Sequence, residues 1–477
     1  MKRNSYYLLS LGCSKNTVDS DSMAQLLNRA GCQAVADADD ASILIVNTCG
    51  FIGPSREESI SALRALAGAK ASRQTLIAAG CLSQIWGPRL AREVPGLDGV
   101  IGARRWMDIV AFIDRVRATK HPQPLYHLPE AARLVGTDEG GVLRAAVAGA
   151  SAYIKIADGC RRPCAFCTIP HIKGTAVSRR PESILAEARA LSERGMRELI
   201  LIAQDLTDYG HDLGVRGGLP SLIESMCEAA PGVKWIRLMY AYPGAVSDRL
   251  IEVMAARPQV AHYLDLPLQH GHPDTLKRMR RPANVEWVYR TLDKLRAAMP
   301  DLAIRTTFIV GYPGETEAEF EGLLKFAADL QFDRVGCFKY SYEPTTPSGR
   351  LDGQVPEELK TERYQRLMEL QQRISLARNQ AQVGRTLDVL VEGRGDGLTL
   401  GRSYRDAPEI DGLVILEGEA PIGDVVPVKI SGAMTYDLTG TLDARQAAIV
   451  AVNTISRPLS QPDNGRRRRR SASRPAP

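Results

Sequence analysis

Short apolar runs alternate with longer helix-like stretches over the first part of the chain. The apolar runs are residues 6–12, 42–48 and 75–80. Their length is typical of short buried strands, whereas the stretches near 16–30 and 55–70 favour helices. Strands and helices in alternation predict a doubly wound parallel sheet as the fold of this N-terminal part.

A second alternation of strands and helices fills the middle of the chain. The candidate strands are residues 152–157, 198–203, 235–241, 263–269, 303–310 and 334–341. Six strand–helix units within about 190 residues predict an open, partial (β/α)6 barrel.

The pattern changes after a polar helix that is predicted over residues 357–380. Four short strands with Gly-rich turns follow, at residues 386–393, 398–404, 412–418 and 425–433. They are typical of a small antiparallel β-barrel, so the fold class is α/β with a C-terminal barrel. The expected organisation is an N-terminal domain at 4–118, a linker at 119–145, a central domain at 146–375, a barrel at 376–442 and a tail at 443–477.

Composition and charge place the chain among globular proteins. Of its 477 residues, 44% are hydrophobic and 24% are charged. No apolar run is long enough to span a bilayer and no signal peptide is evident, so we expect a cytoplasmic protein without a membrane partner. The net charge of +6 is concentrated in residues 463–477, with six arginines and one aspartate. This Arg-rich tail is predicted to be disordered, either as a solvated end or as a weak tether to RNA.

Three of the nine cysteines lie within eight residues, in the segment CRRPCAFC. Cys160, Cys164 and Cys167, the central trio, follow the first strand of the central domain, where parallel α/β folds place their chemistry. Three thiolates can bind three irons of a 4Fe–4S cluster and leave the fourth iron open. The alternatives are a zinc site completed by a ligand such as His171, or chance clustering.

A second set of three cysteines is dispersed along the N-terminal domain. Cys13, Cys49 and Cys81, the N-terminal trio, each follow a predicted strand. Because the carboxyl ends of parallel strands share one edge, the three could converge on a metal, but the pattern alone leaves chance equally open. The remaining cysteines are interpreted as inert buried thiols: Cys32, Cys227 and Cys337.

The segment CRRPCAFC resembles the cluster loop of radical S-adenosylmethionine (SAM) enzymes. With LGCSKNTVDS, VNTCGF, AAGCLSQ and the small barrel, it makes residues 5–442 similar to the methylthiotransferases of that superfamily. The resemblance implies two 4Fe–4S clusters, one on the central trio with SAM at its open iron and an auxiliary one on the N-terminal trio. It also implies a TRAM domain and insertion of a methylthio group into a C–H bond, with one SAM as radical source and another as methyl donor.

The acceptor is predicted from motifs and from charge. CTIPHIKGTAVSRRP, AQDLTDYG and GRSYRDAPEIDG resemble the RimO-like branch, which modifies the β-carbon of an aspartate in small-subunit ribosomal protein twelve. The MiaB-like branch instead modifies an adenosine in transfer RNA. Residues 379–442 carry five Lys and Arg against ten Asp and Glu, and an acidic module repels RNA but attracts a basic protein. A generic acidic surface is the alternative, and SGAMTYDLTG departs from the RimO-like pattern by lacking a more acidic, His-bearing version.

Further segments are candidates for contact with SAM. IVGYPGETEAEF resembles the radical SAM element along the SAM adenine, with Gly311 allowing close approach of the backbone, although its T-x-x-E motif equally predicts a helix capping box. Gln204 and Asp205 end the second strand of the central domain, where the superfamily contacts the SAM amino group. His270 either serves the site or caps a strand.

These features together predict an aspartate methylthiotransferase that receives electrons from reduced flavodoxin or ferredoxin. Two alternatives remain open at this point. One is a transfer-RNA methylthiotransferase with the same chemistry, and the other is a cluster-bearing ribosome-binding factor without catalysis.

Overall fold

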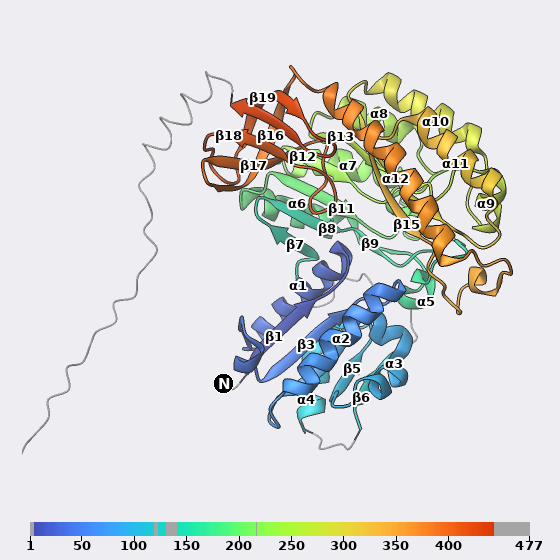
Figure 1. Cartoon of the computed structure of the whole chain (residues 1–477). Helices are drawn as coiled ribbons and strands as arrows, with labels where there is room; N and C mark the ends of the chain where they lie inside the picture. Colours follow the sequence, from blue (N-terminus) through green and yellow to red (C-terminus); the bar gives the residue numbers. More distant parts are fainter. Residues whose placement is uncertain (1–3, 119–122, 130–140, 216, 443–477) are drawn as a thin grey trace, which may run out of the picture.

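The computed structural model describes residues 4–118, 123–129, 141–215 and 217–442. Figure 1 shows the N-terminal part in blue below the central part, which runs from green to orange, while the C-terminal strands form a separate body at the upper left. Among the described residues, no helix is both long and apolar enough to cross a membrane. The predicted tail at 443–477 lies outside the described residues.

The N-terminal domain is built on six parallel strands in the order β2-β1-β3-β4-β5-β6. They are β1 (Ser5–Ser10), β2 (Gln33–Ala34), β3 (Ile43–Thr48), β4 (Thr75–Gly80), β5 (Gly99–Ile101) and β6 (Leu125–His127). The three predicted strands are present as β1, β3 and β4. The winding changes direction between β1 and β3, which is the position where open α/β sheets bind their ligands.

Helices cover both faces of this sheet, as a doubly wound fold requires. Helices α1 (Ser14–Arg29) and α4 (Ile109–Ala118) pack on one face, and α2 (Gly53–Ala69) and α3 (Cys81–Glu93) pack on the other. Burial on both faces explains why the strands read as continuous apolar runs. The prediction of a doubly wound parallel sheet is confirmed.

The central domain is a sheet of seven strands in the order β15-β14-β13-β12-β11-β8-β7. The strands are β7 (Ala145–Ala148), β8 (Ser151–Lys155), β11 (Glu198–Ile202), β12 (Trp235–Leu238), β13 (Val260–Asp265), β14 (Ala303–Val310) and β15 (Arg334–Lys339). The longer helices of this domain are α6 (Pro181–Glu193), α7 (Gly218–Ala229), α8 (Asp248–Ala256), α10 (Val285–Ala298), α11 (Glu317–Leu330) and α12 (Glu357–Gln380). Within this sheet, all neighbouring strands from β8 to β15 are parallel. Strands β7 and β15 are the two ends of the sheet, so the partial barrel is open as predicted.

The stretch predicted to be a linker, 119–145, contributes to both sheets. Strand β6 pairs in parallel with β5, and β7, which begins at the end of this stretch, adds antiparallel to β8. Each strand has only three or four residues, and five of the seven residues are exposed or half-buried. Runs this short carry too few apolar positions for a period to be recognised.

The C-terminal domain is a closed barrel in the order β16-β17-β18-β20-β19. Its strands are β16 (Thr386–Gly395), β17 (Leu398–Ser403), β18 (Val414–Glu417), β19 (Val425–Ala433) and β20 (Leu438–Leu442). The fifth strand, β20, was not predicted, and it pairs with β18 in parallel while the other pairings are antiparallel. This strand lies at the end of the polar segment SGAMTYDLTG and begins directly after the bend within that segment.

Buried ion pairs attach the barrel to the central sheet. Arg402 Nη2 lies 2.7 Å from Glu198 Oε2, and Arg405 Nη2 lies 2.5 Å from Asp333 Oδ1. All four side chains are at most 3% exposed. The segment GRSYRDAPEIDG therefore positions the barrel by matching its charges to those of the central domain.

We expect Glu198→Gln to lower the free energy of unfolding by about 3–5 kcal/mol, because it leaves two buried guanidinium groups short of a partner. Burial would raise the pKa of Glu198, but Arg237 and Arg402 outweigh it and hold the pKa at about 2. The stabilisation is thus complete above the ordinary pKa of 4.5 and is lost as the pH falls towards 2. Thermal denaturation of the parent and of Glu198→Gln from pH 7 to pH 3 measures this loss of stabilisation.

The control is Glu252→Gln, which removes an exposed partner of Arg249 and should change stability by less than about 1 kcal/mol. Equal destabilisation by the two substitutions would contradict the role of Glu198.

Candidate metal centres

The N-terminal trio lies at the carboxyl ends of three neighbouring strands. Cys13 comes three residues after β1, Cys49 directly follows β3, and Cys81 directly follows β4. The register aligns these ends, since Ser10 pairs with Asn47 and Thr48 pairs with Gly80. The structure therefore gathers at one sheet edge three cysteines that are more than thirty residues apart in the sequence.

Close backbone packing holds these strand ends together. Gly12 has a φ of +93°, and a Cβ added there would lie 2.7 Å from Cβ and 2.9 Å from Sγ of Cys49. A Cβ added at Gly50 would lie 2.8 Å from the backbone nitrogen of Leu82. The residue before Cys13 thus touches Cys49, and the residue after Cys49 touches the residue after Cys81.

Asn16 organises the same edge and was missed by the sequence analysis. Its Nδ2 lies within hydrogen-bond distance of the carbonyl oxygens of Leu11 (2.7 Å), Thr48 (3.2 Å) and Asn47 (3.3 Å). Its Oδ1 accepts a weak hydrogen bond from Cys81 Sγ at 3.9 Å. One buried amide therefore connects the ends of all three strands. Its position three residues after Cys13 is the only sequence feature that could have pointed to Asn16, and that position alone does not indicate a role.

The central trio lies in a loop between the short strand β9 (Ala157–Asp158) and the short helix α5 (Ile169–Lys173). Strand β10 (Val177–Ser178) pairs with β9 and closes this loop at its base. The amide nitrogen of Cys160 donates to the carbonyl oxygen of Gly174 at 3.1 Å, and that of Cys167 donates to Cys164 at 3.1 Å. The three sulfurs are thus held on a short, tethered loop.

Burial disfavours the thiolate form in both trios. It raises the pKa of Cys160 to about 11 and the pKa values of Cys81 and Cys167 to about 12. It also raises the pKa of Cys49. As free thiols these groups stay protonated at neutral pH, so binding of a metal must release their protons.

Positive groups are placed where they favour anionic sulfur. Cys13 is the N-cap of α1 and Cys81 is the first residue of α3, and helix N-termini stabilise negative charge. In the central trio, Arg281 Nη1 lies 3.5 Å from Cys164 Sγ, and the amide of Arg162 donates to Cys160 Sγ at 3.4 Å. Both trios therefore combine partly buried thiols with nearby donors, although Cys13 itself is exposed, and this suits thiolate ligands of a metal group.

Neither trio forms the compact set of three ligand atoms that a single tetrahedral ion would gather, within the residues that the structure describes. Zn–S bonds of about 2.3 Å place two sulfurs only about 3.8 Å apart. Among the described residues, ligand atoms that all lie within 4.8 Å of one another occur in one group of three, and it contains no cysteine. His171, considered above as a fourth zinc ligand, is not in such a group either. Three thiolates that leave one position open are instead a ligand set that suits an iron–sulfur cluster.

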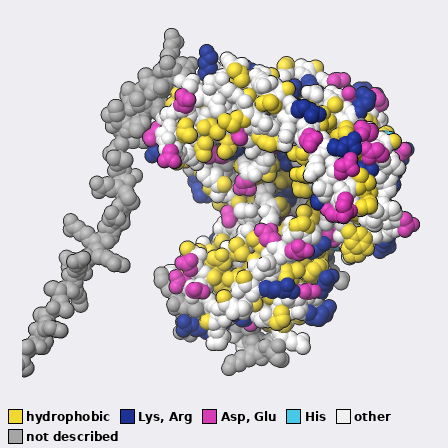
Figure 2. Space-filling view, viewed as in Figure 1, with side chains coloured by type: hydrophobic (Ala, Val, Ile, Leu, Met, Phe, Trp, Pro, Cys, Tyr) yellow, Lys and Arg dark blue, Asp and Glu magenta, His cyan; other side chains and the backbone are white. Residues whose placement is uncertain are grey.

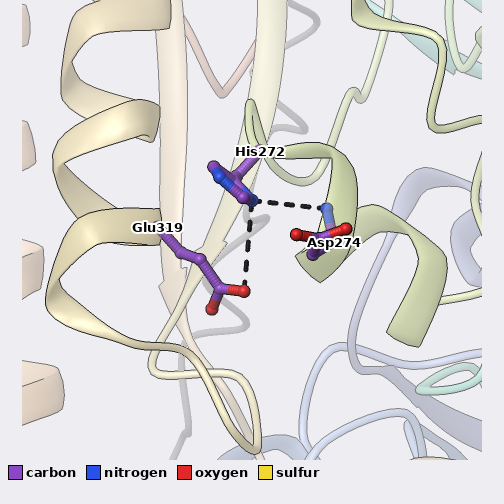
Figure 3. A group of neighbouring side chains, drawn as sticks. All are labelled: His272, Asp274 and Glu319. Atoms are coloured by element: carbon purple, nitrogen blue, oxygen red, sulfur yellow. Dashed lines mark hydrogen bonds and ion pairs between the residues drawn. The ribbon is translucent and has the colours of Figure 1, made fainter.

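That one compact group consists of His272, Asp274 and Glu319, and helix capping accounts for it. Figure 3 shows His272 above the first turn of α9 (Pro273–Arg278), where its Nδ1 accepts from the amide of Asp274 at 3.3 Å. Glu319 Oε2 lies 2.6 Å from Arg278 Nη2 and also accepts from the amide of Thr316 at 2.9 Å. The predicted capping box of α11 is therefore confirmed.

The residues predicted to contact SAM have different surroundings. Gln204 Oε1 is buried and has no hydrogen-bond partner among the described residues. Asp205 instead binds Arg162 Nε at 2.6 Å and Thr207 Oγ1 at 2.6 Å. Gln204 thus retains a polar atom for a ligand, whereas the carboxylate of Asp205 orients a side chain of the cysteine loop.

Gly311 and His270 are occupied by contacts within the protein. Gly311 has a φ of +70°, and a Cβ there would collide with the side chain of Lys360 from α12. His270 Nδ1 accepts from the amide of His272 at 2.9 Å, and its Nε2 lies 3.5 Å from Glu315 Oε2. Burial lowers the pKa of His270, which favours this neutral, capping role.

The three cysteines interpreted as inert lie away from both trios. Cys227 is buried in α7, while Cys32 and Cys337 are half-buried. Burial raises the pKa of each thiol, to about 12 for Cys337. None of them follows the carboxyl end of a strand.

The two trios face the same junction between domains. Helix α5, which follows the central trio, packs against α3, which begins at Cys81. Arg104, beyond β5, donates to the carbonyl oxygens of His171 (2.8 Å) and Ile172 (3.0 Å) in α5. The carboxyl edges of the two sheets therefore meet across this short helix (Figure 1).

Comparison with known proteins gives matches over most of the chain. Residues 154–327 match the radical SAM superfamily, residues 5–102 match the uncharacterized protein family UPF0004, and residues 383–442 match the TRAM domain. A ribosomal protein uS12 methylthiotransferase RimO from Chloroflexus aurantiacus is 48% identical over 91% of this chain and 99% of that protein. The protein of the same name from Herpetosiphon aurantiacus is 47% identical over 92% and 99%.

Solved structures share the fold at low sequence identity. The radical SAM methyltransferase TsrM from Kitasatospora setae, with tryptophan and a SAM analogue bound, has a TM-score of 0.53 at 13% identity, covering 73% of this chain and 75% of that one. The same enzyme with cobalamin and a [4Fe-4S] cluster has a TM-score of 0.52 at 14% identity, covering 84% and 81%.

We expect Gly12→Ala to separate Cys13 from Cys49, because the added methyl group has no space and the backbone is left-handed. The matched control is Gly31→Ala, since Gly31 has a similar φ of +81° but nothing within 4 Å of the added Cβ. Both variants should lose about 1 kcal/mol or more of stability to backbone strain. Only Gly12→Ala should also lose iron and sulfide after anaerobic reconstitution, and equal retention in both would contradict the packing argument.

Proposed function

Because the chain belongs to the RimO family of radical SAM methylthiotransferases, we propose that it adds a methylthio group to the β-carbon of an aspartate in small-subunit ribosomal protein uS12. The observation that carries this proposal is the convergence of two separate cysteine trios on one junction between domains. A radical enzyme with one cluster needs only the central trio. A second trio close to the first is what the transfer of sulfur to the same substrate carbon requires.

The central trio would hold the 4Fe–4S cluster that binds SAM, and the N-terminal trio would hold an auxiliary 4Fe–4S cluster. Their donor chemistry and their position at the carboxyl ends of strands support this assignment. When bound, these groups supply one-electron cleavage of SAM and delivery of sulfur. A second SAM would supply the methyl group, and reduced flavodoxin or ferredoxin would supply electrons.

The protein's own residues would position these groups and exclude water. Arg281 donates to Cys164 and stacks on the ring of Tyr242 at 4.5 Å, while Arg162 stacks on the same ring at 4.1 Å. The unpartnered Oε1 of Gln204 would accept from the amino group of SAM. Asp205 would keep Arg162 in place beside the cysteine loop.

The surface charge of the barrel supports a basic protein as acceptor. Arg402 and Arg405 are buried in ion pairs with the central domain, as Asp406 is. The exposed acidic side chains of the barrel include Glu392, Asp396, Glu409, Glu417 and Glu419. The basic residues that remain exposed are Arg385, Arg394 and Lys429, so the barrel surface stays acidic. Such a surface attracts a basic ribosomal protein and repels a nucleic-acid backbone.

A recess between the domains offers a route for this acceptor. Figure 2 shows it opening on one side, between the N-terminal domain below and the barrel and central domain above. A segment of uS12 that enters there while its basic body rests on the barrel would approach the junction of the two trios. The Arg-rich tail, proposed as a weak contact to RNA, lies outside the described residues.

The two-cluster assignment is tested with triple alanine variants. Anaerobic reconstitution should give about eight irons per chain in the parent and about four in each of two variants, one lacking the N-terminal trio and one lacking the central trio. With SAM and dithionite, the first variant should still form 5′-deoxyadenosine and the second should not. Replacing Cys32, Cys227 and Cys337 together is the control and should change neither value. About four irons in the parent would contradict the assignment.

The acceptor is tested by anaerobic incubation of the reconstituted enzyme with SAM, reductant and either uS12 or transfer RNA. Intact-mass analysis should find one methylthio group on uS12 and peptide mapping should place it on an aspartate, with none on RNA. Because opposite charges are screened by salt, the KM for uS12 should rise with ionic strength. Modification of RNA alone would identify a transfer-RNA enzyme, and absence of 5′-deoxyadenosine would favour a non-catalytic binding factor. The variant without the central trio is the negative control.

A further inference from the structure

Five buried ionic side chains lie where the N-terminal and central domains meet. They form the interface charge cluster, which consists of Asp19, Arg144, Lys155, Asp158 and Lys173. Each of these side chains is at most 4% exposed. Asp19 comes from α1 of the N-terminal domain, and the other four come from the segment that leads into the central sheet or from the central domain itself.

Asp19 is the acceptor for all three cations of the cluster. Its Oδ1 lies 2.5 Å from Lys155 Nζ and 2.7 Å from Arg144 Nη2, and its Oδ2 lies 2.7 Å from Lys173 Nζ. Asp158 also faces the three cations, at 3.2 to 3.6 Å. One carboxylate of the N-terminal domain therefore pairs with three cations that lie outside that domain.

The formal charges of the cluster do not balance. Three cations face two carboxylates, which leaves an excess of one buried positive charge. Arg144 Nε and Nη1 have no hydrogen-bond partner among the described residues. Burial lowers the pKa of Lys155, Asp158 and Asp19 raise it, and Lys173 and Arg144 lower it, so that the net shift is downward. A buried excess charge is unfavourable unless an anion lies nearby, so the cluster calls for a negative group that its own side chains do not supply.

The N-terminal trio is where that negative group would be. Lys173 ends α5, which packs against α3, the helix that begins at Cys81. Asn16, three residues before Asp19 in α1, accepts a hydrogen bond from Cys81 Sγ at 3.9 Å, and Asp19 Oδ2 lies 2.7 Å from Lys173 Nζ. The pair of Asp19 and Lys173 therefore lies beside the N-terminal trio.

We propose that Lys173 is a positioning residue for the N-terminal trio, which it serves in two ways. Through Asp19 it fixes the N-terminal domain on the central domain, and its positive charge compensates the negative charge that the trio acquires when its thiolates hold a cluster. This inference rests on the proposed function, because three thiolates around an oxidised 4Fe–4S core carry a net charge of about −1. A nearby cation favours the more negative, reduced state, so Lys173 raises the reduction potential of that cluster.

The test uses the full chain with the central trio replaced by alanine, so that only the N-terminal trio binds a cluster. After anaerobic reconstitution, dithionite donates one electron to each cluster in the presence of redox mediators, and electron paramagnetic resonance follows the reduced form. The midpoint potential should become more negative in Lys173→Met and less negative in Asp19→Asn. Lys173→Arg keeps the charge and should stay close to the parent.

The opposite signs separate an electrostatic role from a structural one. Lys173→Met and Asp19→Asn break the same contact, so loosening of the domains alone would move both potentials in one direction. The control is Lys234→Met at the amino end of β12, where the lysine is 44% exposed and pairs with Asp388; it should change nothing. If the variants still bind iron, shifts of the same sign, or no shift, would overturn the inference. Absence of iron in the parent of this series would instead overturn the cluster assignment itself. If Lys173→Met does not fold, Lys173→Gln replaces it in the comparison with Asp19→Asn, because it also removes the charge.

Discussion

The carboxylate of Asp19 lies among three cations that it does not fully neutralise, and the placement of the two cysteine trios depends on this contact. Without it, the N-terminal sheet would still gather Cys13, Cys49 and Cys81 at its edge, because that edge is built by hydrogen bonds within one domain. What Asp19 adds is a fixed relation between this edge and α5. A reaction that needs two metal groups at one substrate carbon depends on such a relation.

Buried ions set the second junction of the molecule as well. The barrel rests on the central domain through Arg402 and Arg405, whose partners Glu198 and Asp333 lie on or beside the sheet. Apolar surfaces can slide over one another, whereas a buried ion pair tolerates only the arrangement in which each charge meets its partner. Buried ion pairs therefore specify the geometry of both junctions, and the recess visible in Figure 2 opens between the bodies that they join.

The chemistry of the sulfurs follows from the same balance of burial and charge. Burial raises the pKa of Cys81 and Cys167 to about 12, so the free thiols are unreactive. Helix N-termini, Arg281 and Lys173 favour the anionic form that a metal group stabilises outright. The trios are thus poised to bind metal rather than to act as nucleophiles on their own.

Strand positions, and with them the cysteines that follow strands, could be predicted because apolar runs are local and parallel strands share one carboxyl edge. This reasoning identified the doubly wound sheet, the open central barrel and both trios. It missed strands whose runs are too short or too polar to show a period, namely β2, β5, β6, β7, β10 and β20. It could not identify Asn16 or Asp19, and it did not foresee the protein partners of Asp205 and Gly311, two residues that it predicts to contact SAM. A polar side chain takes its role from whatever lies opposite it, and the partner of Asp19, Lys173, is 154 residues away. The sequence therefore determined which cysteines belong to each trio, and only the tertiary structure decided that the two trios lie at one junction between domains, because charge pairing between distant segments has no local pattern.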